Sequence, residues 1–537
     1  MAVGHVILPG SDRVALAGAR ATGRANANAT IEVTLKLRRI APLPVLTGRP
    51  AATITRKTLA AKYGASPKDI AKVSAVFKRL GLTTVHSDAA TRTVRLSGTV
   101  AAMEAAFLVR LFDYAHPGGD YRGRVGPIHL PVDLQGVVEG VFGLDNRRVV
   151  RQRPQPVGGG RTRAATTVPS SWYIPSELAT HYNFPPGDGT GQTVGILEFG
   201  GGYFPADLQQ FCALAGVSVP KVKAISTDGT STSAHDGAEG EVMLDIEVVA
   251  GICPKATIVA YFADFTEQGW ITAIDAAVHD ATNDPGVVSA SWGYAEDADI
   301  WTTAAMTQVN DTLQDAAMIG VTVCIAAGDD GSSDAIADGH AHVDFPGSSP
   351  YVLAVGGTTI PVKNGKQPDI AWKEGDGLRA DNGGSTGGGV SAVFPRPTWQ
   401  SAIKIKSVNP GAIVGRVMPD VAANADWVAS PYLLVVDGQA QANGGTSAAT
   451  PLCASLVALM NAARGAGKRV GFLTPVLYQG KGGTSGTPLG TLGCTDVTSG
   501  ENKTDAIGGY HAGKGYDAVS GWGTPNGKKL LAALPPG

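Results

Sequence analysis

One stretch says most about how this chain folds: Asn443-Gly444-Gly445-Thr446-Ser447-Ala448-Ala449-Thr450-Pro451-Leu452-Cys453. A serine follows two glycines and precedes an alanine-rich apolar run that keeps helical spacing as far as Met460. The pattern predicts a buried helix with Ser447 in its first turn, where free backbone N–H groups and the helix dipole stabilise developing negative charge. Small neighbours would let a substrate backbone approach closely. The alternative is an ordinary Gly/Ser turn that begins a core helix.

A second segment, residues 240–251, carries two carboxylates in an apolar setting. Glu241 and Asp245 are four residues apart, so on a helix they share one face. Apolar residues occupy most of the helix circumference, which predicts a buried helix. Two buried neighbouring carboxyls do not easily both ionise, so we expect them to share a proton. Glu239 and Glu247 are expected to form a solvated acidic stripe instead.

The base that activates Ser447 is the next question. None of the ten histidines opens a helix in the His-Gly-Thr setting that a subtilisin-type base requires. His235 is the nearest candidate, but the apolar stretch that it introduces carries carboxylates. The Gly-Thr-Ser-x-x-x-Pro segment with Glu241-x-x-x-Asp245 resembles the sedolisin, or serine-carboxyl peptidase, family, and within it the kumamolisins.

This resemblance implies a role for each of the three residues. Ser447 would be the nucleophile, Glu241 the general base and acid, and Asp245 the residue that orients Glu241. A carboxylate base suits acid conditions, because below roughly pH 5 a free imidazole is protonated and cannot accept a proton.

Residues 321–331 read as a buried strand that ends in a Gly/Asp turn. The segment resembles the family segment whose aspartate helps to form the oxyanion hole, which implies that role for Asp329. An oxyanion helper donates a hydrogen bond, so Asp329 must be protonated when it acts, which indicates a low working pH. Asp330 adds a second carboxyl, which we expect to favour the protonated form of Asp329.

Further positions resemble supporting residues of the family. Glu198 and Trp292 are implied to extend the network behind the catalytic pair. Ser291 and Gly293 are expected to offer backbone groups to an extended substrate peptide. Asp344 resembles a residue of the S1 pocket. No Gly-Lys-Ser/Thr follows the glycines after the strand that carries Glu198, so nucleotide binding is not expected.

The C-terminal region resembles the calcium site of the family. Hard cations prefer oxygen ligands and mix carboxylates with loop carbonyls, which glycine lets turn inward. The pattern is not that of an EF-hand. One calcium ion is the implied cofactor, bound by the carboxylates of Asp496 and Asp517, the main-chain carbonyls of Val497, Gly513 and Gly515, and water.

Composition agrees with a large folded protein. The 537 residues include 17% charged residues and 71 glycines, which is typical of a compact, loop-rich chain. The five cysteines are odd in number and scattered, so we expect buried thiols rather than disulfides or a zinc site. No run of eighteen apolar residues predicts a membrane span, and no signal-peptide core is visible.

Charge divides the chain in two. Residues 1–165 hold 25 Lys+Arg and 10 Asp+Glu, or +15, and the remainder holds 44−25=19 and 46−10=36, or −17. We expect a propeptide at 1–150, a cleavable Pro/Gly/Arg-rich linker at 151–168 and a catalytic domain at 169–537. The basic residues alternate with strand and helix patterns and form no arm, so no nucleic-acid partner is expected.

Both parts are predicted to be α/β. In the propeptide, residues 30–37 and 91–96 alternate as strands, and helices are expected from Ser66-Pro67 and over 100–107. This order resembles the ferredoxin-like propeptide of the family. In the catalytic part, glycine-ended apolar strands alternate with helices, which predicts a doubly wound, mainly parallel sheet like that of subtilisins.

The resemblance implies a secreted, monomeric, acid-acting serine-carboxyl endopeptidase that acts on proteins and peptides. It would be made as a self-processing precursor that its own propeptide inhibits. We expect the attraction between the two parts to fade as carboxylates are protonated, so that the linker is cut near 161–167. Two alternatives remain. One is a subtilisin-type peptidase with His235 as base. The other is an inactive relative that binds peptides, and the intact candidate catalytic residues argue against this second alternative.

Overall fold

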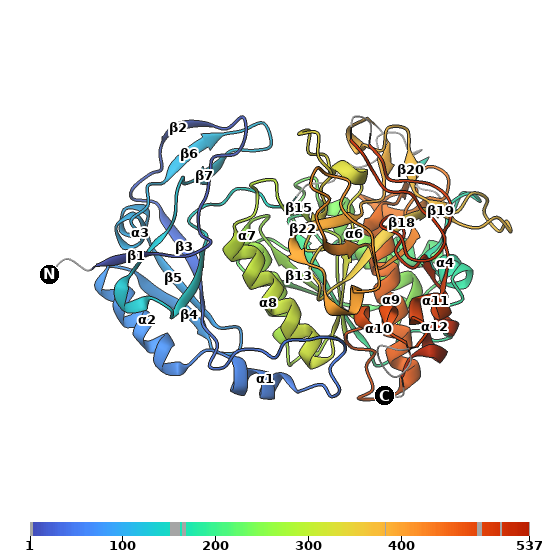
Figure 1. The fold of residues 1–537 in the computed structure, drawn as a ribbon, viewed down its shortest axis with the longest axis horizontal. Helices are drawn as coiled ribbons and strands as arrows, with labels where there is room; N and C mark the ends of the chain where they lie inside the picture. Colours follow the sequence, from blue (N-terminus) through green and yellow to red (C-terminus); the bar gives the residue numbers. More distant parts are fainter. Residues whose placement is uncertain are drawn as a thin grey trace.

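The computed structural model describes residues 4–150, 162–163, 168–381, 383–480, 486–504 and 507–535. It contains two bodies that lie side by side, an N-terminal one drawn in blue and a larger one from green to red (Figure 1). Most of the expected linker, 151–161 and 164–167, lies outside the described residues.

The N-terminal body is built on an antiparallel sheet in the order β4-β5-β3-β9. Its helix α2 begins where predicted, because the side chain of Ser66 accepts a hydrogen bond from the Lys68 N–H. The order and the helices confirm the ferredoxin-like prediction. The elements of the sheet and its helices are β3 (Thr30–Leu37), α2 (Pro67–Arg79), β4 (Thr83–Asp88), β5 (Thr93–Thr99), α3 (Val100–Phe107) and β9 (Val138–Phe142). Around them lie β1 (His5–Ile7), β2 (Arg20–Arg24), α1 (Arg56–Tyr63), β6 (Phe112–Ala115), β7 (Tyr121–Gly123) and β8 (His129–Pro131).

The larger body holds the predicted doubly wound sheet, in the order β12-β13-β11-β14-β16-β18. These strands pair in parallel, β24 adds a parallel partner to β18, and β19 is antiparallel to it. The strands are β11 (Thr193–Phe199), β12 (Lys221–Ser226), β13 (Thr257–Ala263), β14 (Val287–Ala290), β16 (Thr322–Ala326), β18 (Leu353–Thr359), β19 (Ile370–Ala371) and β24 (Val421–Asn424).

Helices cover both faces of this sheet, which explains why its strands are apolar runs rather than alternating ones. Val194 and Ile196 of β11 enter one core with α6 (Glu239–Ile252) and α9 (Thr446–Arg464). Leu197 and Phe199 enter the other core with α7 (Glu267–His279) and α8 (Thr303–Ile319).

Helix α9 is the predicted helix that carries Ser447. It is long and apolar enough to cross a membrane by length and composition, but 89% of its most apolar window is buried inside the protein. Its apolar character is therefore that of a core helix. All five cysteines are free thiols, as predicted, and four of them are buried.

Shorter elements complete the larger body. Its remaining helices are α4 (Pro175–His181), α5 (Pro205–Ala215), α10 (Thr474–Tyr478), α11 (Leu489–Gly493) and α12 (Gly527–Ala533). Its short antiparallel pairs are β15 (Tyr294–Ala295) with β17 (Asp344–Phe345), β20 (Lys373–Glu374) with β21 (Gly384–Ser385), β22 (Gly389–Pro395) with β23 (Gly415–Met418), β25 (Tyr432–Val436) with β26 (Gln439–Asn443), and β27 (Cys494–Thr495) with β28 (Thr524–Pro525).

The two bodies meet along α7 and α8, which lie between the N-terminal sheet and the large sheet (Figure 1). Buried cations of the N-terminal body pair there with carboxylates of these two helices. The pairs are Arg13 with Glu267 at 2.7 Å, Lys36 with Asp275 at 2.7 Å, Arg39 with Asp315 at 3.0 Å, and Arg92 with Asp311 at 3.4 Å. The basic N-terminal part and the acidic remainder of the chain thus form ion pairs with each other at this interface.

Candidate active site

The serine stands at the N-terminus of α9 because a glycine turns the chain sharply before it. Gly445 has φ +85°, and a Cβ there would lie 2.8 Å from Asp329 Oδ2. Glycine therefore relieves both backbone strain and a steric clash. Ser447 follows two residues later, buried in the first turn of the helix, where N–H groups lack intrahelical partners.

Pro451 explains an unusual contact of the serine backbone. Proline has no N–H, so the carbonyl of Ser447, four residues earlier, is not used by the helix at this position. That carbonyl instead accepts a hydrogen bond from Ser291 Oγ at 3.1 Å. The Ser-x-x-x-Pro spacing thus leaves the serine backbone available to the end of the neighbouring strand β14.

Ser291 also contacts the acidic helix. Its Oγ lies 2.8 Å from Oδ1 of Asp245 and 3.1 Å from the carbonyl oxygen of Ser447, so its one hydroxyl proton lies within reach of both oxygens. Both carboxylates are buried as predicted, with Asp245 at 0% and Glu241 at 7% exposure. The side chain of Ser291 therefore belongs to the support behind the nucleophile, while its expected backbone contact with substrate stays a prediction.

Glu198 and Trp292 also meet, as the resemblance implied. Trp292 Nε1 donates a hydrogen bond to Glu198 Oε2 at 3.1 Å. Burial, together with the negative charge of Glu241, raises the pKa of Glu198 well above its ordinary value despite that bond. The charge of Glu241 therefore acts on Glu198, and both side chains are buried.

Asp329 lies directly against the nucleophile segment. The Thr446 N–H donates to Asp329 Oδ1 at 2.8 Å, and the Thr446 hydroxyl lies 2.5 Å from the same oxygen. The strand β16 ends three residues earlier, so the turn after it carries Asp329 to the N-terminus of α9. The structure thus brings Asp329 to the residue that precedes Ser447.

The expectation for Asp330 was wrong, because its charge is paired. Arg379 donates to Asp330 Oδ2 through Nε at 2.9 Å and to Oδ1 through its backbone N–H at 3.0 Å. Arg379 Nη1 also lies 3.8 Å from Asp329 Oδ2. Asp330 therefore does not face Asp329 as an isolated like charge; it anchors the hairpin β20–β21 beside the site.

Glu247 corrects a second expectation. It is fully buried rather than solvated, and its Oε2 accepts a hydrogen bond from the Val435 N–H at 2.8 Å. Strand β25 packs over α6 and supplies that donor. Burial raises the pKa of Glu247 well above its ordinary value. Glu239, near the start of the helix, is half-buried and accepts a hydrogen bond from the Gly237 N–H.

Gly293 and Asp344 lie in close contact. A Cβ at position 293 would come within 1.7 Å of Asp344 Oδ1, so only glycine fits there. Asp344 is buried at the start of β17, which pairs with β15 immediately after Gly293. The structure therefore joins these two candidates of the substrate pocket, although they are 51 residues apart in the sequence.

The candidate calcium ligands gather around one loop. Asp496 Oδ2 accepts a hydrogen bond from the Gly515 N–H at 2.9 Å, and Asp517 Oδ2 accepts one from the Gly513 N–H at 2.9 Å. Burial raises the pKa of Asp517 above its ordinary value. Among the described residues, no group of three or more His, Cys, Asp or Glu side chains could hold a metal. A cation here would therefore need carbonyl oxygens beside the two carboxylates.

His235 has surroundings that differ from those of a buried base. Its side chain is 60% exposed, its Nδ1 lies 3.6 Å from Asp437 Oδ1, and its ring stacks on Phe204 at 4.3 Å.

Sequence reasoning missed the side-chain roles of Ser291, Thr446 and Arg379. The Ser-x-x-x-Pro spacing could have indicated the contact of Ser291 with the backbone of Ser447. A single arginine in a glycine-rich segment gave no sign of the role of Arg379.

Comparisons with known proteins agree with this architecture. Residues 227–476 match the subtilase family model, and residues 48–147 match the pro-kumamolisin activation domain. Kumamolisin of Bacillus sp. strain MN-32 is 43% identical over 90% of this chain and 86% of its own length. Sedolisin of Pseudomonas sp. strain 101 is 30% identical over 95% of this chain and 88% of its own length.

A solved structure extends the comparison to three dimensions. Pseudomonas sedolisin, a serine-carboxyl proteinase complexed with two molecules of pseudo-iodotyrostatin, has a TM-score of 0.58 and 31% identity. It covers 67% of this chain and 97% of its own. The fold and the comparisons define a serine-type peptidase with a subtilisin-like catalytic domain and an N-terminal activation domain. The chain belongs to the sedolisin family, as a kumamolisin-like serine-carboxyl peptidase made as a zymogen.

Proposed function

We propose that this zymogen matures into an acid-acting endopeptidase in which Ser447 is the nucleophile and Glu241 the general base and acid. One observation carries the proposal: a single hydroxyl, that of Ser291, lies within hydrogen-bond distance of both the Asp245 carboxyl group and the carbonyl oxygen of Ser447. This placement supports the approach of the α6 carboxylates to the nucleophile. The endopeptidase action and the roles of the individual residues are proposed because the chain resembles the kumamolisins.

The proposed reaction starts with proton transfer from Ser447 Oγ to Glu241 as Oγ attacks the peptide carbonyl. Protonated Asp329 and the N-terminus of α9 stabilise the oxyanion of the tetrahedral intermediate. Glu241 then gives its proton to the leaving amine, and an acyl-enzyme remains on Ser447. Water, deprotonated by Glu241, releases the product and restores the serine. Asp245 orients Glu241, and Glu198 with Trp292 holds the carboxyl network behind it.

The domain boundaries belong to the same proposal: propeptide 1–150, linker 151–168 and catalytic domain 169–537. The hydrophobic core of the N-terminal body, which runs from Leu8 to Leu144, supports the first boundary. Backbone pairing supports a linker near the site, because β10 (Thr162–Arg163) is antiparallel to β26, the strand that leads to Ser447. We propose cleavage near 161–167, a substrate peptide along Ser291 and Gly293, and Asp344 in the S1 pocket.

The pH dependence of processing follows from the buried interface. Burial alone would raise the pKa of Asp315, but His279, whose Nε2 lies 3.5 Å from Asp315 Oδ2, and the charge of Arg39 outweigh it and lower that pKa. A carboxylate with a depressed pKa stabilises the docked state at neutral pH, and that contribution is lost as the pH falls through the lowered value. Docking should therefore weaken below about pH 4, the ordinary range of aspartate.

We therefore expect the purified precursor to remain intact at pH 7.5 and to be cut in the linker near pH 4. The measurement is incubation at graded pH with gels and intact mass, followed by hydrolysis of denatured protein across pH 3–8. Activity should also be highest in acid, since Asp329 must carry a proton. Rapid processing at pH 7.5 with none near pH 4 would refute this, and loss of activity on His235→Ala would favour the subtilisin-type alternative.

Calcium is proposed as the cofactor, with Asp496 and Asp517 as carboxylate ligands and the carbonyls of Val497, Gly513 and Gly515 as neutral ones. The donor set supports this, because two carboxylates bind one glycine-rich loop and Asp517 is buried away from cationic side chains of the described residues. A bound cation would offset the cost of burying that charge and would tie the loop to β27.

Removal of calcium is expected to lower thermal stability. At a free concentration of 100 times Kd, a ligand that binds only the folded state adds about 2.7 kcal/mol. Unfolding scans with EDTA and with added calcium should therefore differ by several degrees. Asp517→Asn should abolish the difference, and Asp376→Asn, on an exposed turn, should retain it. An equal response in Asp517→Asn would place the ion elsewhere.

Secretion and a monomeric state complete the proposal. Both come from the family resemblance alone. Cell fractionation would test secretion, and light scattering of the purified precursor would test whether it is monomeric.

A further inference from the structure

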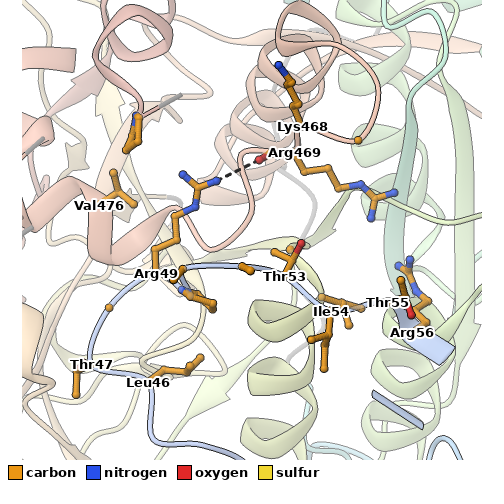
Figure 2. Close-up of a pocket in the computed structure, with 18 of the residues that line it drawn as sticks. Leu46, Thr47, Arg49, Thr53, Ile54, Thr55, Arg56, Lys468, Arg469 and Val476 are labelled. Carbon is orange, nitrogen blue, oxygen red and sulfur yellow. Dashed lines mark hydrogen bonds between the residues drawn. The ribbon is translucent and has the colours of Figure 1, made fainter. Parts of the chain in front are cut away.

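A large groove lies between the N-terminal body and the larger one, on a side that the proposed reaction does not use. Residues 45–57, which we call the strap, form one wall, and the loop after α9 forms the other (Figure 2). The groove has a volume of about 1420 Å³. Pockets that bind small molecules usually have volumes of about 300–1,000 Å³. The groove is larger than that range, so it has room for a ligand larger than a single small ion.

Cations line both walls of the groove. Arg49, Arg56 and Lys57 come from the strap, and Lys468 and Arg469 come from the loop after α9. Figure 2 shows the side chain of Arg49 extending from the strap towards the backbone of Arg469 on the opposite wall. Asp284 is the one carboxylate among the described lining residues. It is already engaged, because it pairs with Arg56 and, at 2.7 Å, with Arg469.

Arg49 forms no ion pair with a carboxylate of the described residues. Its Nη2 donates to the backbone carbonyl of Arg469 at 3.4 Å. Burial and the nearby positive charge of Arg464 lower the pKa of Arg49. Within the described part of the chain, Arg464 Nη2 is itself buried without a hydrogen-bond partner. Two cations that approach one another in a partly buried place repel, and an anion between them would remove that cost.

The same interface is built differently along α7 and α8. There, Lys36, Arg39 and Arg92 of the N-terminal body each face a carboxylate of the larger one. At the groove, Asp284 is the one carboxylate among the described lining residues, and it pairs with Arg56 of the strap and with Arg469 of the larger body. Docking therefore brings more cations than carboxylates together here, and a mobile counter-ion is the simplest way to offset the excess.

We propose that the groove binds a polyanion that carries several phosphate groups and bridges the strap to the catalytic domain, which stabilises the docked precursor. Guanidinium groups bind phosphate oxygens in pairs, and lysine supplies a compact charge, so the lining matches this ligand class. The size of the groove favours linked phosphates over one. Because the strap supplies half of the site, release of the propeptide destroys it.

The test uses the full-length Ser447→Ala precursor at pH 7.5, its intact mass confirmed, with tripolyphosphate as the probe. We expect calorimetry to detect binding and thermal unfolding to shift upward with the probe. The double variant Arg49→Gln/Lys468→Gln should bind about tenfold more weakly or worse, because two charge-assisted contacts are lost. Without the probe, the double variant should unfold at a higher temperature than its parent, because the repulsion is gone.

The controls separate the groove from general effects. Arg110→Gln and Lys404→Gln remove exposed cations elsewhere and should leave the response to the probe unchanged. Citrate, a polycarboxylate that also chelates calcium, is tested at the same free calcium and should give a smaller shift. Equal binding by the double variant, no binding at millimolar probe, or a double variant that is less stable than its parent without probe would each overturn the proposal.

Discussion

Glu241→Gln is expected to lower kcat for protein hydrolysis by about 10⁴-fold or more, and Ser447→Ala by up to about 10⁶-fold. Glutamine keeps the size of the side chain but cannot accept the hydroxyl proton of the serine. The two groups would act as one unit, so the double variant should be little worse than Ser447→Ala. Both variants should also leave the precursor uncut at pH 4. Steady-state kinetics and gels measure these effects.

A matched control lies on the same helix. Glu239 is half-buried and bonds only the turn before α6, so Glu239→Gln should retain activity within a few-fold. Circular dichroism of each variant separates loss of chemistry from loss of folding. If Glu241→Gln kept more than a tenth of the activity, another group would have to be the base.

Lys36→Met is expected to weaken docking of the propeptide by about 10²–10⁴-fold, since removing one partner of a buried pair costs about 3–5 kcal/mol. Lys36 Nζ lies 2.7 Å from Asp275 Oδ2, with 1% and 6% of the two side chains exposed. The variant leaves the carboxylate of Asp275 buried, with the hydroxyl of Thr312, at 2.8 Å, as its remaining hydrogen-bond partner among the described residues. Processing should then begin at a higher pH than in the wild-type precursor.

Hydrogen exchange of β3 and α7 in the Ser447→Ala background measures the docking directly. The double change Lys36→Met/Asp275→Leu should recover much of the protection, because no unpaired charge remains. Lys68→Met, at an exposed site on α2, is the matched control and should behave like the parent. Unchanged exchange in Lys36→Met would mean that this pair does not hold the two bodies together.

The zymogen interface therefore uses charge in two ways. Along α7 and α8, cations meet carboxylates, and Asp315, whose pKa is lowered, stops contributing to docking in acid. At the strap, cations of both bodies outnumber the single carboxylate, Asp284, and burial with the nearby charge of Arg464 lowers the pKa of Arg49. Acid would then weaken docking of the propeptide at α7 and α8, and a bound anion would strengthen it at the strap. The Lys36 and Arg49 variants distinguish these two effects.

Local patterns in the sequence predicted much of the fold. The Ser66-Pro67 start of α2, the helix over 100–107 and the apolar strands of the large sheet were recognisable, because side-chain periodicity and capping depend on neighbours in the chain. The buried setting of Glu241 and Asp245 was predicted for the same reason. Glu247 was assigned to solvent wrongly, because periodicity does not show that β25 covers that face.

Local sequence patterns were enough to place the serine at the start of a helix, to find the helix with the carboxylates, and to separate a basic from an acidic part. The three-dimensional fold was needed to find that Ser291 lies between Asp245 and Ser447, that Arg379 pairs with Asp330, and that cations from both bodies gather at the strap. These contacts join residues that are far apart in the chain. Their distances depend on strand order and helix packing, which no local pattern of residues specifies.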